Sequence, residues 1–382
     1  MRIGYCTRTN PHDKRSWSGT HYFIMKSLKE HYEEVIPLGP LKNKFCSLGK
    51  ALNRASKTLL KKQLLYRHSP IIGREFAKVL KRKAEKEKCD VLFVPSGGVL
   101  IARLKTEIPI ISLFDATIKG LIDYYGGYSN LLSISKKWAI EADMAAMEKS
   151  SEIIYSSAWA AESAIKEYSC KQEKAHIIPF GANLDNVPPG GEILLYREKG
   201  GKTCKLFFIG VDWIRKGGKI AFDTMVELNR RGIDTELTVC GCVPPDGVRH
   251  GKLKVIKFLD KNNALHAKKL NSLYLDSSFL ILPTRSECSA IVYCESAAYC
   301  LPVISTQTGG VPSYVENGAN GFLLSLEADY RMYADVIESS WRDKNRYYKL
   351  CEKSREKYEK ELNWNTWGIR VSKLINGAAG VK

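Results

Sequence analysis

The chain has 382 residues, of which 44% are hydrophobic and 26% are charged, and its formal net charge is +18. That length exceeds one typical core, so we expect two domains. No apolar run approaches the roughly 18 residues needed to cross a bilayer, which excludes a membrane-spanning class. The N-terminus lacks the apolar segment of a secretory signal and the eleven cysteines follow no disulfide spacing, so a reducing cytoplasm is the predicted setting.

The first half of the chain alternates short apolar runs with helical stretches, among them residues 133–150 and 158–167. Strands that alternate with helices predict a parallel, doubly wound sheet. The predicted strands are residues 2–7, 35–38, 91–95, 110–114, 153–156 and 176–179.

A loop of small residues, Trp17-Ser18-Gly19-Thr20, follows the first predicted strand and precedes a helix at 21–31. Locally, Ser18 or Thr20 is expected to cap that helix. Gly19 also lets backbone approach a phosphate or a sugar hydroxyl closely. We therefore predict that Gly19 contributes to ligand binding as well as to the turn.

Residues 41–88 form a basic segment with 15 Lys or Arg residues against three acidic ones. Apolar residues recur in it at three- and four-residue spacing, which predicts an amphipathic helix. One interpretation is a helix packed on the sheet with its charges in water. The other is attraction to an anionic membrane surface, worth roughly 1 kcal/mol per basic residue. No RNA-binding motif or zinc finger accompanies the charge, so no nucleic acid partner is predicted. The apolar residues are Phe45, Leu48, Leu52, Ala55 and Leu59.

Asp115 follows the predicted strand 110–114, at the end of a parallel strand where open α/β sheets bind ligands. Its carboxylate can orient a sugar or an acceptor. The alternative is that it only caps the next helix.

The strand–helix pattern then restarts after a Pro/Gly-rich stretch at 188–191, whose composition predicts an interdomain linker, and a charged stretch at 197–202. The predicted strands of this half are residues 205–209, 236–241, 253–258, 279–282 and 303–305. Two Rossmann-like, doubly wound domains that face a central cleft follow from the repeated pattern.

Two cations, Arg215 and Lys216, follow the predicted strand 205–209 and its terminal Gly210. Arg can grip a diphosphate with two parallel hydrogen bonds, and Lys adds a point charge. This segment therefore predicts a phosphate site.

Two carboxylates seven residues apart flank the start of another predicted helix. Glu287 lies in the turn after the buried strand 279–282, and Glu295 lies inside the helix. Ser289 is predicted to cap that helix, whose first N–H groups favour a phosphate. Carboxylates beside such an end can accept hydrogen bonds from sugar and ribose hydroxyls, so the segment indicates a nucleotide-sugar site.

At this point the chain resembles glycosyltransferase family 4, the retaining enzymes of GT-B fold. The resemblance rests on motifs in a fixed order between about residues 175 and 325. They are Ile177–Asn183 (IIPFGAN), Gly210 with Arg215-Lys216-Gly217, Glu287 with Glu295, Thr308–Pro312 (TGGVP), Glu316-Asn317-Gly318 and Asn320-Gly321.

The resemblance implies a hexosyltransferase that moves a sugar from a nucleotide-sugar to an acceptor with retention. A lipid-linked saccharide in cell-envelope polysaccharide synthesis fits the basic helix, and a soluble saccharide acceptor stays open. The resemblance also implies an acceptor-side domain of residues 1–184 with 363–382 and a donor domain of residues 185–362. The C-terminal segment 363–376 would be a helix that returns to the first domain. The predicted setting is cytoplasmic, with peripheral attachment to the inner face of the cell membrane as an option.

By the same resemblance Glu287 contacts the sugar hydroxyls and Glu295 the ribose. No two Asp residues stand two apart, so the chain lacks the Asp-x-Asp metal clamp of other transferases, and no metal or other cofactor is predicted. The predicted catalytic residues are Glu287, Arg215, Lys216 and Asp115, and the predicted donor-binding residues are Gly19, Gly210, Arg215, Lys216, Glu287, Ser289, Ala290, Ile291 and Glu295.

Two alternatives of other classes stay open. A nucleotide-sugar epimerase of GT-B fold would act on the donor without an acceptor. A non-catalytic protein that binds a sugar nucleotide or a polyanion would explain the positive charge but not the pair of glutamates.

Overall fold

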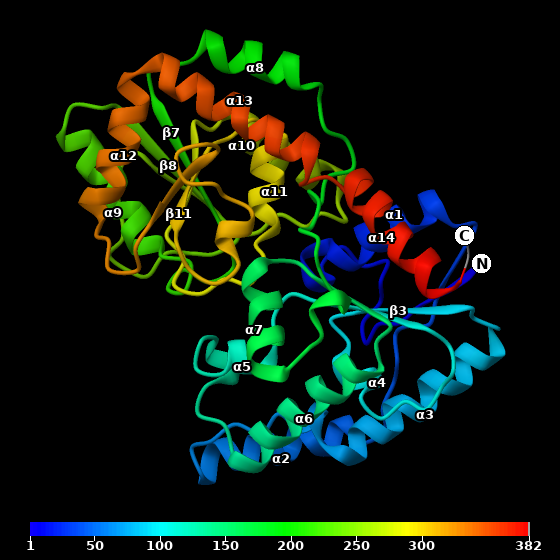
Figure 1. Cartoon of the computed structure of the whole chain (residues 1–382). Coiled ribbons are helices and arrows are strands. Elements are labelled where there is room, and N and C mark those ends of the chain that lie inside the picture. The colour runs from blue at the N-terminus through cyan, green and yellow to red at the C-terminus, as the bar shows by residue number, and fades with distance from the viewer. Residues whose placement is uncertain (381–382) are drawn as a thin grey trace. The chain divides into compact units, whose positions relative to one another are not determined.

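A computed structural model describes residues 1–380, and these divide into two compact units (Figure 1). Within the described residues, the first unit comprises Met1–Ser16, His21–Ile178 and residues 368–380. The second comprises Trp17–Thr20 and Pro179–Trp367. The acceptor-side domain of residues 1–184 with 363–382 and the donor domain of residues 185–362, expected from the sequence, stay a prediction.

The first unit is built on a six-stranded parallel sheet in the order β2-β1-β3-β4-β5-β6. The order reverses between β1 and β3, which makes that pair the switch point where ligands bind in open α/β sheets. All six predicted strands are present, with ends that differ by one or two residues. They are β1 (Arg2–Tyr5), β2 (Glu34–Pro37), β3 (Val91–Pro95), β4 (Ile110–Phe114), β5 (Glu152–Tyr155) and β6 (Ala175–Ile177).

Helices cover both faces of this sheet (Figure 1). On one face α1 (Thr20–His31) packs against α14 (Trp364–Ala378), so closely that a Cβ on Gly368 would lie 2.5 Å from the Ser27 hydroxyl. On the other face the apolar core joins the sheet to α3 (Pro70–Lys86), α4 (Gly98–Ile101) and α6 (Ser133–Lys149). The remaining helices are α2 (Cys46–Leu59), α5 (Ile118–Leu121) and α7 (Ala158–Tyr168).

The second unit holds another six-stranded parallel sheet, in the order β12-β11-β10-β7-β8-β9. Renumbered within the unit this is 6-5-4-1-2-3, the order of dinucleotide-binding Rossmann folds, with its switch point between β7 and β10. The strands are β7 (Cys204–Ile209), β8 (Thr235–Cys240), β9 (Leu253–Ile256), β10 (Phe279–Leu282), β11 (Val303–Thr306) and β12 (Gly321–Leu324). The sequence did not predict β12.

Helices also flank the second sheet on its two faces (Figure 1). One pair, α9 (Gly218–Arg230) and α12 (Tyr330–Arg342), packs together on one face. On the other face lie α10 (Ala264–Asp276), α11 (Ile291–Ala298) and α13 (Lys344–Lys360), and α13 contacts α8 (Gly190–Lys199). The prediction of two Rossmann-like folds is confirmed.

The linker prediction is wrong for the second half of the Pro/Gly-rich stretch 188–191, because a helix begins at Gly190. Residues 190–199 form α8, and Arg197 is buried. Its guanidinium donates to the carbonyl oxygens of Tyr299, Ser277 and Tyr274 at 2.6 to 3.1 Å. Because charge-assisted hydrogen bonds to three carbonyls compensate a buried cation, Arg197 fastens α8 to its unit.

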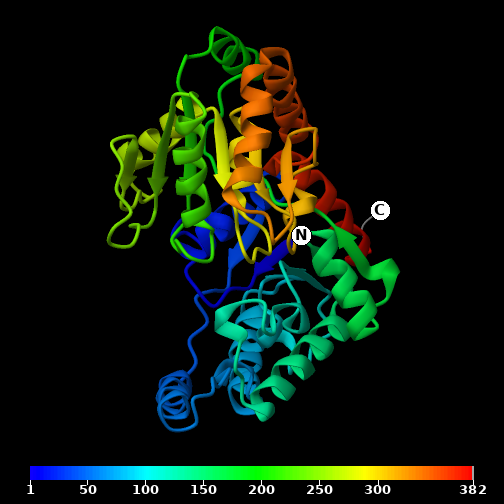
Figure 2. The ribbon, with the colours of Figure 1, turned by 90° about the vertical axis from the view of Figure 1, so that its left-hand side faces the viewer.

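The amphipathic helix exists as α2, but its leucines do not face the sheet. Leu48, Leu52 and Leu59 are 60%, 52% and 78% exposed, whereas Gly49 and Ser56 are buried. Figure 2 shows α2 at the margin of its unit. The interpretation in which these leucines pack on the sheet is therefore wrong. Within residues 1–380, no helix combines the length and the apolar character needed to cross a membrane.

Candidate functional site

The first candidate site lies at the switch point of the second sheet. Gly210, Arg215 and Lys216 follow β7, and Glu287 follows β10, its neighbour in the sheet. Parallel strands place their carboxyl ends at one edge, so these side chains from distant parts of the sequence meet there.

An ion-paired cluster forms the centre of this site. The Lys216 Nζ contacts the Glu287 Oε2, and the Arg215 Nη1 lies 3.8 Å from that same oxygen. Arg215 also donates from Nη1 to the Ser286 carbonyl at 2.9 Å. Lys216 is 8% exposed and Glu287 is 6% exposed, so their attraction is weakly screened. The Arg215 Nε also lies 3.6 Å from the Asp212 Oδ2, so two carboxylates pair with the two cations at the strand ends.

Glycines bring the two loops of the cluster together. Gly217 adopts φ +76°, and a Cβ there would lie 2.0 Å from the Pro283 carbonyl oxygen, so only glycine fits. A Cβ on Gly210 would touch the Lys216 stem at 3.0 Å. The Arg285 N–H donates to the Arg215 carbonyl at 2.7 Å, which ties the loop after β7 to the loop after β10. These backbone contacts thus fix the positions of the Cα atoms of Arg215 and Lys216.

The helix after Glu287 begins later than the sequence predicted. Its first residue is Ile291, and the cap position is Ala290, which makes no side-chain cap bond. The predicted capping by Ser289 is therefore wrong, because Ser289 lies one residue before the cap. The predicted donor-binding residues 289–291 do lie at the start of this helix. The Gly310 N–H donates to the Glu287 carbonyl at 3.0 Å.

Glu295 is fully buried inside α11. Lys261 contacts its Oε1, and the Tyr274 hydroxyl donates to its Oε2 at 2.6 Å. Burial, and then the charge of Glu295, raise the pKa of Tyr274 well above its usual value, so the phenol stays protonated as a donor. Neither partner was predicted from the sequence.

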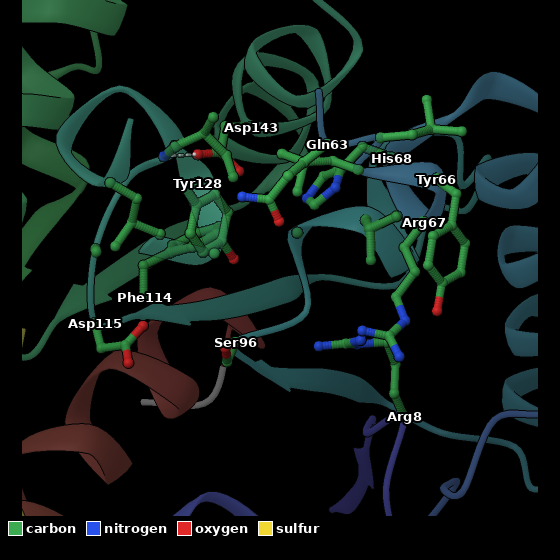
Figure 3. Close-up of a pocket in the computed structure, with 18 of the residues that line it drawn as sticks. Arg8, Gln63, Tyr66, Arg67, His68, Ser96, Phe114, Asp115, Tyr128 and Asp143 are labelled. Atoms are coloured by element: carbon green, nitrogen blue, oxygen red, sulfur yellow. Dashed lines mark hydrogen bonds between the residues drawn. The ribbon is translucent and has the colours of Figure 1, made fainter. Parts of the chain in front are cut away.

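A second candidate site is a pocket of about 270 Å³ in the first unit (Figure 3). Its walls come from the carboxyl ends of β1, β3 and β4, so it lies at the switch point of the first sheet. Asp115, the predicted ligand-orienting residue, lines it. The other polar residues of the lining are Arg8, Asn53, Gln63, Tyr66, Arg67, His68, Ser96, Tyr128 and Asp143.

Asp143 is the buried acid of this pocket. Its Oδ2 accepts the Ile118 N–H at 2.7 Å, and burial raises its pKa from 3.8 to about 7. The folded state therefore binds one more proton than the unfolded state between those two pH values. Linkage then requires that the stability present below about pH 4 is lost as pH rises toward 7, by at most about 1.4 kcal/mol per pH unit.

We accordingly expect Asp143→Asn to flatten the fall in stability between about pH 4 and 7, because a neutral amide has no proton to lose. Urea unfolding midpoints across that range measure it. The exposed Asp123 in the same unit, changed to Asn, is the matched control and should leave the slope as it is. An unchanged slope in Asp143→Asn would contradict the assignment.

The segment Trp17–Thr20 groups with the second unit. Trp17, Ser18 and Gly19 have φ values of 51°, 56° and 89°. Such left-handed backbone is unfavourable for residues with a Cβ and needs support. Asn183 supplies it by donating to the Ser18 carbonyl at 2.9 Å. Gly19 is buried beside this strained turn, and its donor-binding role stays a prediction.

Comparison with known proteins finds a family that is similar to most of the second unit. The profile of a family described as glycosyl transferases group 1 matches residues 197–360. The match covers less than half of the chain, and these residues are similar to that family. The matched region contains the Arg215–Lys216–Glu287 cluster and Glu295.

The curated proteins that resemble this chain are distant in sequence. A D-inositol 3-phosphate glycosyltransferase of Corynebacterium glutamicum is 24% identical over 228 residues, which is 55% of this chain and 53% of that protein. The chain thus matches about half the length of such curated relatives.

Solved structures share the fold at low identity. HepE of Anabaena in complex with UDP gives a TM-score of 0.64 at 15% identity, covering 99% of this chain and 100% of that one. WaaG, a glycosyltransferase involved in lipopolysaccharide biosynthesis, gives 0.63 at 15% identity with the same coverage. The GT-B fold expected from the resemblance is confirmed, whereas membership of family 4 in particular stays a prediction.

The predicted site residues lie in two different units of the structure. Gly210, Arg215, Lys216, Glu287 and Glu295 lie in the second unit, within the residues that match the family model. Asp115 lies in the first unit, in a pocket whose Arg8 and Arg67 were not predicted from the sequence. Among residues 1–380, no group of three or more His, Cys, Asp or Glu side chains could hold a metal ion.

Proposed function

We propose that the chain is a hexosyltransferase that moves a sugar from a nucleoside diphosphate sugar to a saccharide or lipid-linked saccharide, with retention of anomeric configuration. We further propose that it serves cell-envelope polysaccharide synthesis. The observation that carries the proposal is the Arg215–Lys216–Glu287 cluster at the switch point of a group 1 glycosyltransferase domain. HepE, whose fold is similar, was solved with UDP, which makes UDP the first nucleotide to test.

The cluster suits a departing nucleoside diphosphate. Arg215 and Lys216 supply preorganised positive charge where negative charge develops on the leaving phosphate oxygen. Because a diphosphate competes with Glu287 for the same N–H donors, donor binding would turn that carboxylate toward the sugar hydroxyls. Glu295 is assigned to the ribose, with Lys261 and Tyr274 holding its position.

The proposed reaction needs no side-chain base. The acceptor oxygen attacks the anomeric carbon on the face from which the diphosphate departs, and the leaving phosphate oxygen takes the acceptor's proton. Charge stabilisation by the two cations then replaces a metal clamp, so turnover should persist in chelator. Product analysis with a donor sugar, with and without an acceptor, tests the proposal. An epimerised donor in the absence of acceptor, or no turnover with any acceptor, would contradict it.

We also propose that α2 attaches the protein to an anionic membrane surface. The exposed Leu48, Leu52 and Leu59 form one stripe, and Lys50, Arg54 and Lys57 lie on the other face of the same helix. Buried apolar area and attraction to anionic lipid together drive such interfacial binding. The inner face of α2 meanwhile holds the pocket wall, because Asn53 accepts the Leu64 N–H at 2.8 Å.

We expect the protein to cosediment with vesicles that contain phosphatidylglycerol and to dissociate as salt rises. Changing Leu48, Leu52 and Leu59 together to Ser should lower the bound fraction at least about tenfold, since each buried leucine contributes about 1.5 to 3 kcal/mol. Leu265, 77% exposed in the other unit, gives the matched control Leu265→Ser. Equal binding of wild type to neutral and anionic vesicles, or no effect of the triple change, would refute attachment through α2.

A further inference from the structure

The pocket of the first unit has a cationic end that its own residues do not neutralise. Arg8 follows β1, and Arg67 follows α2 in the chain. Figure 3 shows their guanidinium groups next to each other on one side of the pocket. Among residues 1–380, neither arginine forms an ion pair with a carboxylate, although Arg67 stacks 5.3 Å from the ring centre of Tyr66.

This arrangement is costly in the protein alone. Burial, followed by the charge of Arg67, lowers the pKa of Arg8. Arg8 is half-buried and Arg67 is exposed. A cation that is partly removed from water is stabilised by an opposite charge, because desolvation disfavours the ion. A second cation beside it adds repulsion. Arg8 also lowers the pKa of its neighbour His68, which burial brings to about 4, so a neutral imidazole stands there.

His68 supplies a further unmet polar group. Its Nδ1 is buried and has no hydrogen-bond partner among residues 1–380, and the side chain lines the same pocket. Buried polar atoms are nearly always hydrogen-bonded, so an unpartnered one at a pocket wall points to a ligand. Two guanidinium groups and an imidazole thus converge on one end of the pocket.

The opposite end has acid character. In Figure 3, Asp115 and Asp143 lie on the far side of the pocket from the arginines. A carboxylate such as that of Asp115 can accept hydrogen bonds from hydroxyl groups. At about 270 Å³ the pocket is near the lower end of small-molecule sites, which fits a molecule of monosaccharide size.

We propose that this pocket binds the acceptor by an anionic group, a phosphoryl or carboxyl group on a sugar or polyol, with Arg8 and Arg67 gripping the anion and Asp115 accepting from hydroxyls. Planar guanidinium groups match both anions with parallel hydrogen bonds. The inference rests on the proposed function, since it names the acceptor of that reaction. It covers a soluble phosphate and a lipid-linked one alike, because the recognised chemistry is the same.

Binding of small probes tests the inference. We expect myo-inositol 1-phosphate or D-glucuronate to bind about ten- to a hundredfold more tightly than neutral myo-inositol, since a charge-assisted hydrogen bond contributes about 1.5 to 3 kcal/mol. Arg8→Gln and Arg67→Gln should each remove that preference. Arg74→Gln, an exposed arginine on α3, is the matched control and should keep it.

Thermal unfolding separates a binding role from a structural one. Because the arginines repel each other, Arg8→Gln should unfold at the same temperature as wild type or higher. An anionic preference that survives in Arg8→Gln and Arg67→Gln would overturn the inference, as would equal affinity for anionic and neutral probes. Short-chain phosphatidylinositol in the same titration distinguishes a lipid phosphate from a soluble one, and tight binding of either supports the site.

The proposed function and the acceptor inference can be tested independently of each other. Nucleotide binding in the same samples reports on the second unit, which these substitutions do not touch. If nucleotides bind and no anionic probe does, the acceptor inference falls and the sugar-transfer proposal stands. If the anionic probes bind and no nucleotide does, the anion site stands and the proposed function falls.

Discussion

Replacing Arg215 by Gln should lower the turnover of sugar transfer by about ten- to a thousandfold, because a preorganised donor is lost where charge develops on the leaving group. That loss corresponds to about 1.4 to 4 kcal/mol of transition-state stabilisation. Arg215 is partly exposed at the edge of the cluster, so its removal leaves the buried Lys216–Glu287 pair in place. Initial rates at saturating donor, with unfolding temperature measured in parallel, give the result.

Lys216→Met and Glu287→Gln should show losses of the same order, but each also strands a buried partner. Removing one member of a buried ion pair costs about 3 to 5 kcal/mol of stability, so rates must be compared at a temperature where every variant is folded. Lys219→Gln is the matched control, since its ion pair with Asp223 is exposed on the adjoining helix. Transfer at near wild-type rates in Arg215→Gln, Lys216→Met and Glu287→Gln would reject the assignment.

Replacing Lys261 by Met should lower the unfolding temperature of the second unit by roughly 6 to 20 °C. Lys261 is the cationic partner of Glu295, which is fully buried. Among residues 1–380, the partner that the carboxylate would then keep is the Tyr274 hydroxyl. A buried uncompensated charge costs about 3 to 5 kcal/mol, at roughly 2 to 4 °C per kcal/mol for a unit of this size.

The double change Lys261→Met with Glu295→Gln should recover much of that loss, because no buried charge then remains and the amide oxygen can still accept from Tyr274. Calorimetry measures all three variants. Lys254, whose pair with Glu236 is largely in water, provides the control Lys254→Met, which should change stability little. A wild-type unfolding temperature for Lys261→Met would mean that Glu295 is stabilised by other groups.

The fold was largely predictable because buried parallel strands form continuous apolar runs. The run 279–282 in the sequence is β10 without change. The linker prediction failed for a reason of tertiary structure. Prolines and glycines at 188–191 have the composition of a linker, but Arg197 of the helix that begins there binds carbonyls about 80 and 102 residues away. Composition carries no information on such distant partners.

The amphipathic pattern of α2 shows a related limit. The sequence establishes which residues share a helix face, but it does not say whether another element covers that face. Gly49 shows which face of α2 is packed, because a Cβ there would lie 2.4 Å from the Tyr66 ring. Small residues therefore form the packed face, and the leucines are left outside.

The residues of the candidate site that belong to local sequence motifs could be predicted. Their partners that lie far away in the sequence could not. Arg215, Lys216 and Glu287 each follow a strand, so a general rule for parallel sheets brings them together. Lys261 and Tyr274 lie 34 and 21 residues from Glu295, and no pattern linked them to it. For Arg8 and Arg67, the available signal was a basic residue just after the first strand and another within the basic segment.

The most direct test of the central claim is a thermal-shift measurement of the intact protein with UDP, GDP, ADP, CDP and dTDP. A nucleotide at about 100 times its dissociation constant adds about 2.7 kcal/mol to the unit that binds it, or roughly 5 to 11 °C. We predict such a shift with one nucleotide, UDP first, and its loss in Arg215→Gln. No shift with any of the five, from a folded sample, would contradict the assignment of the second unit as a donor site.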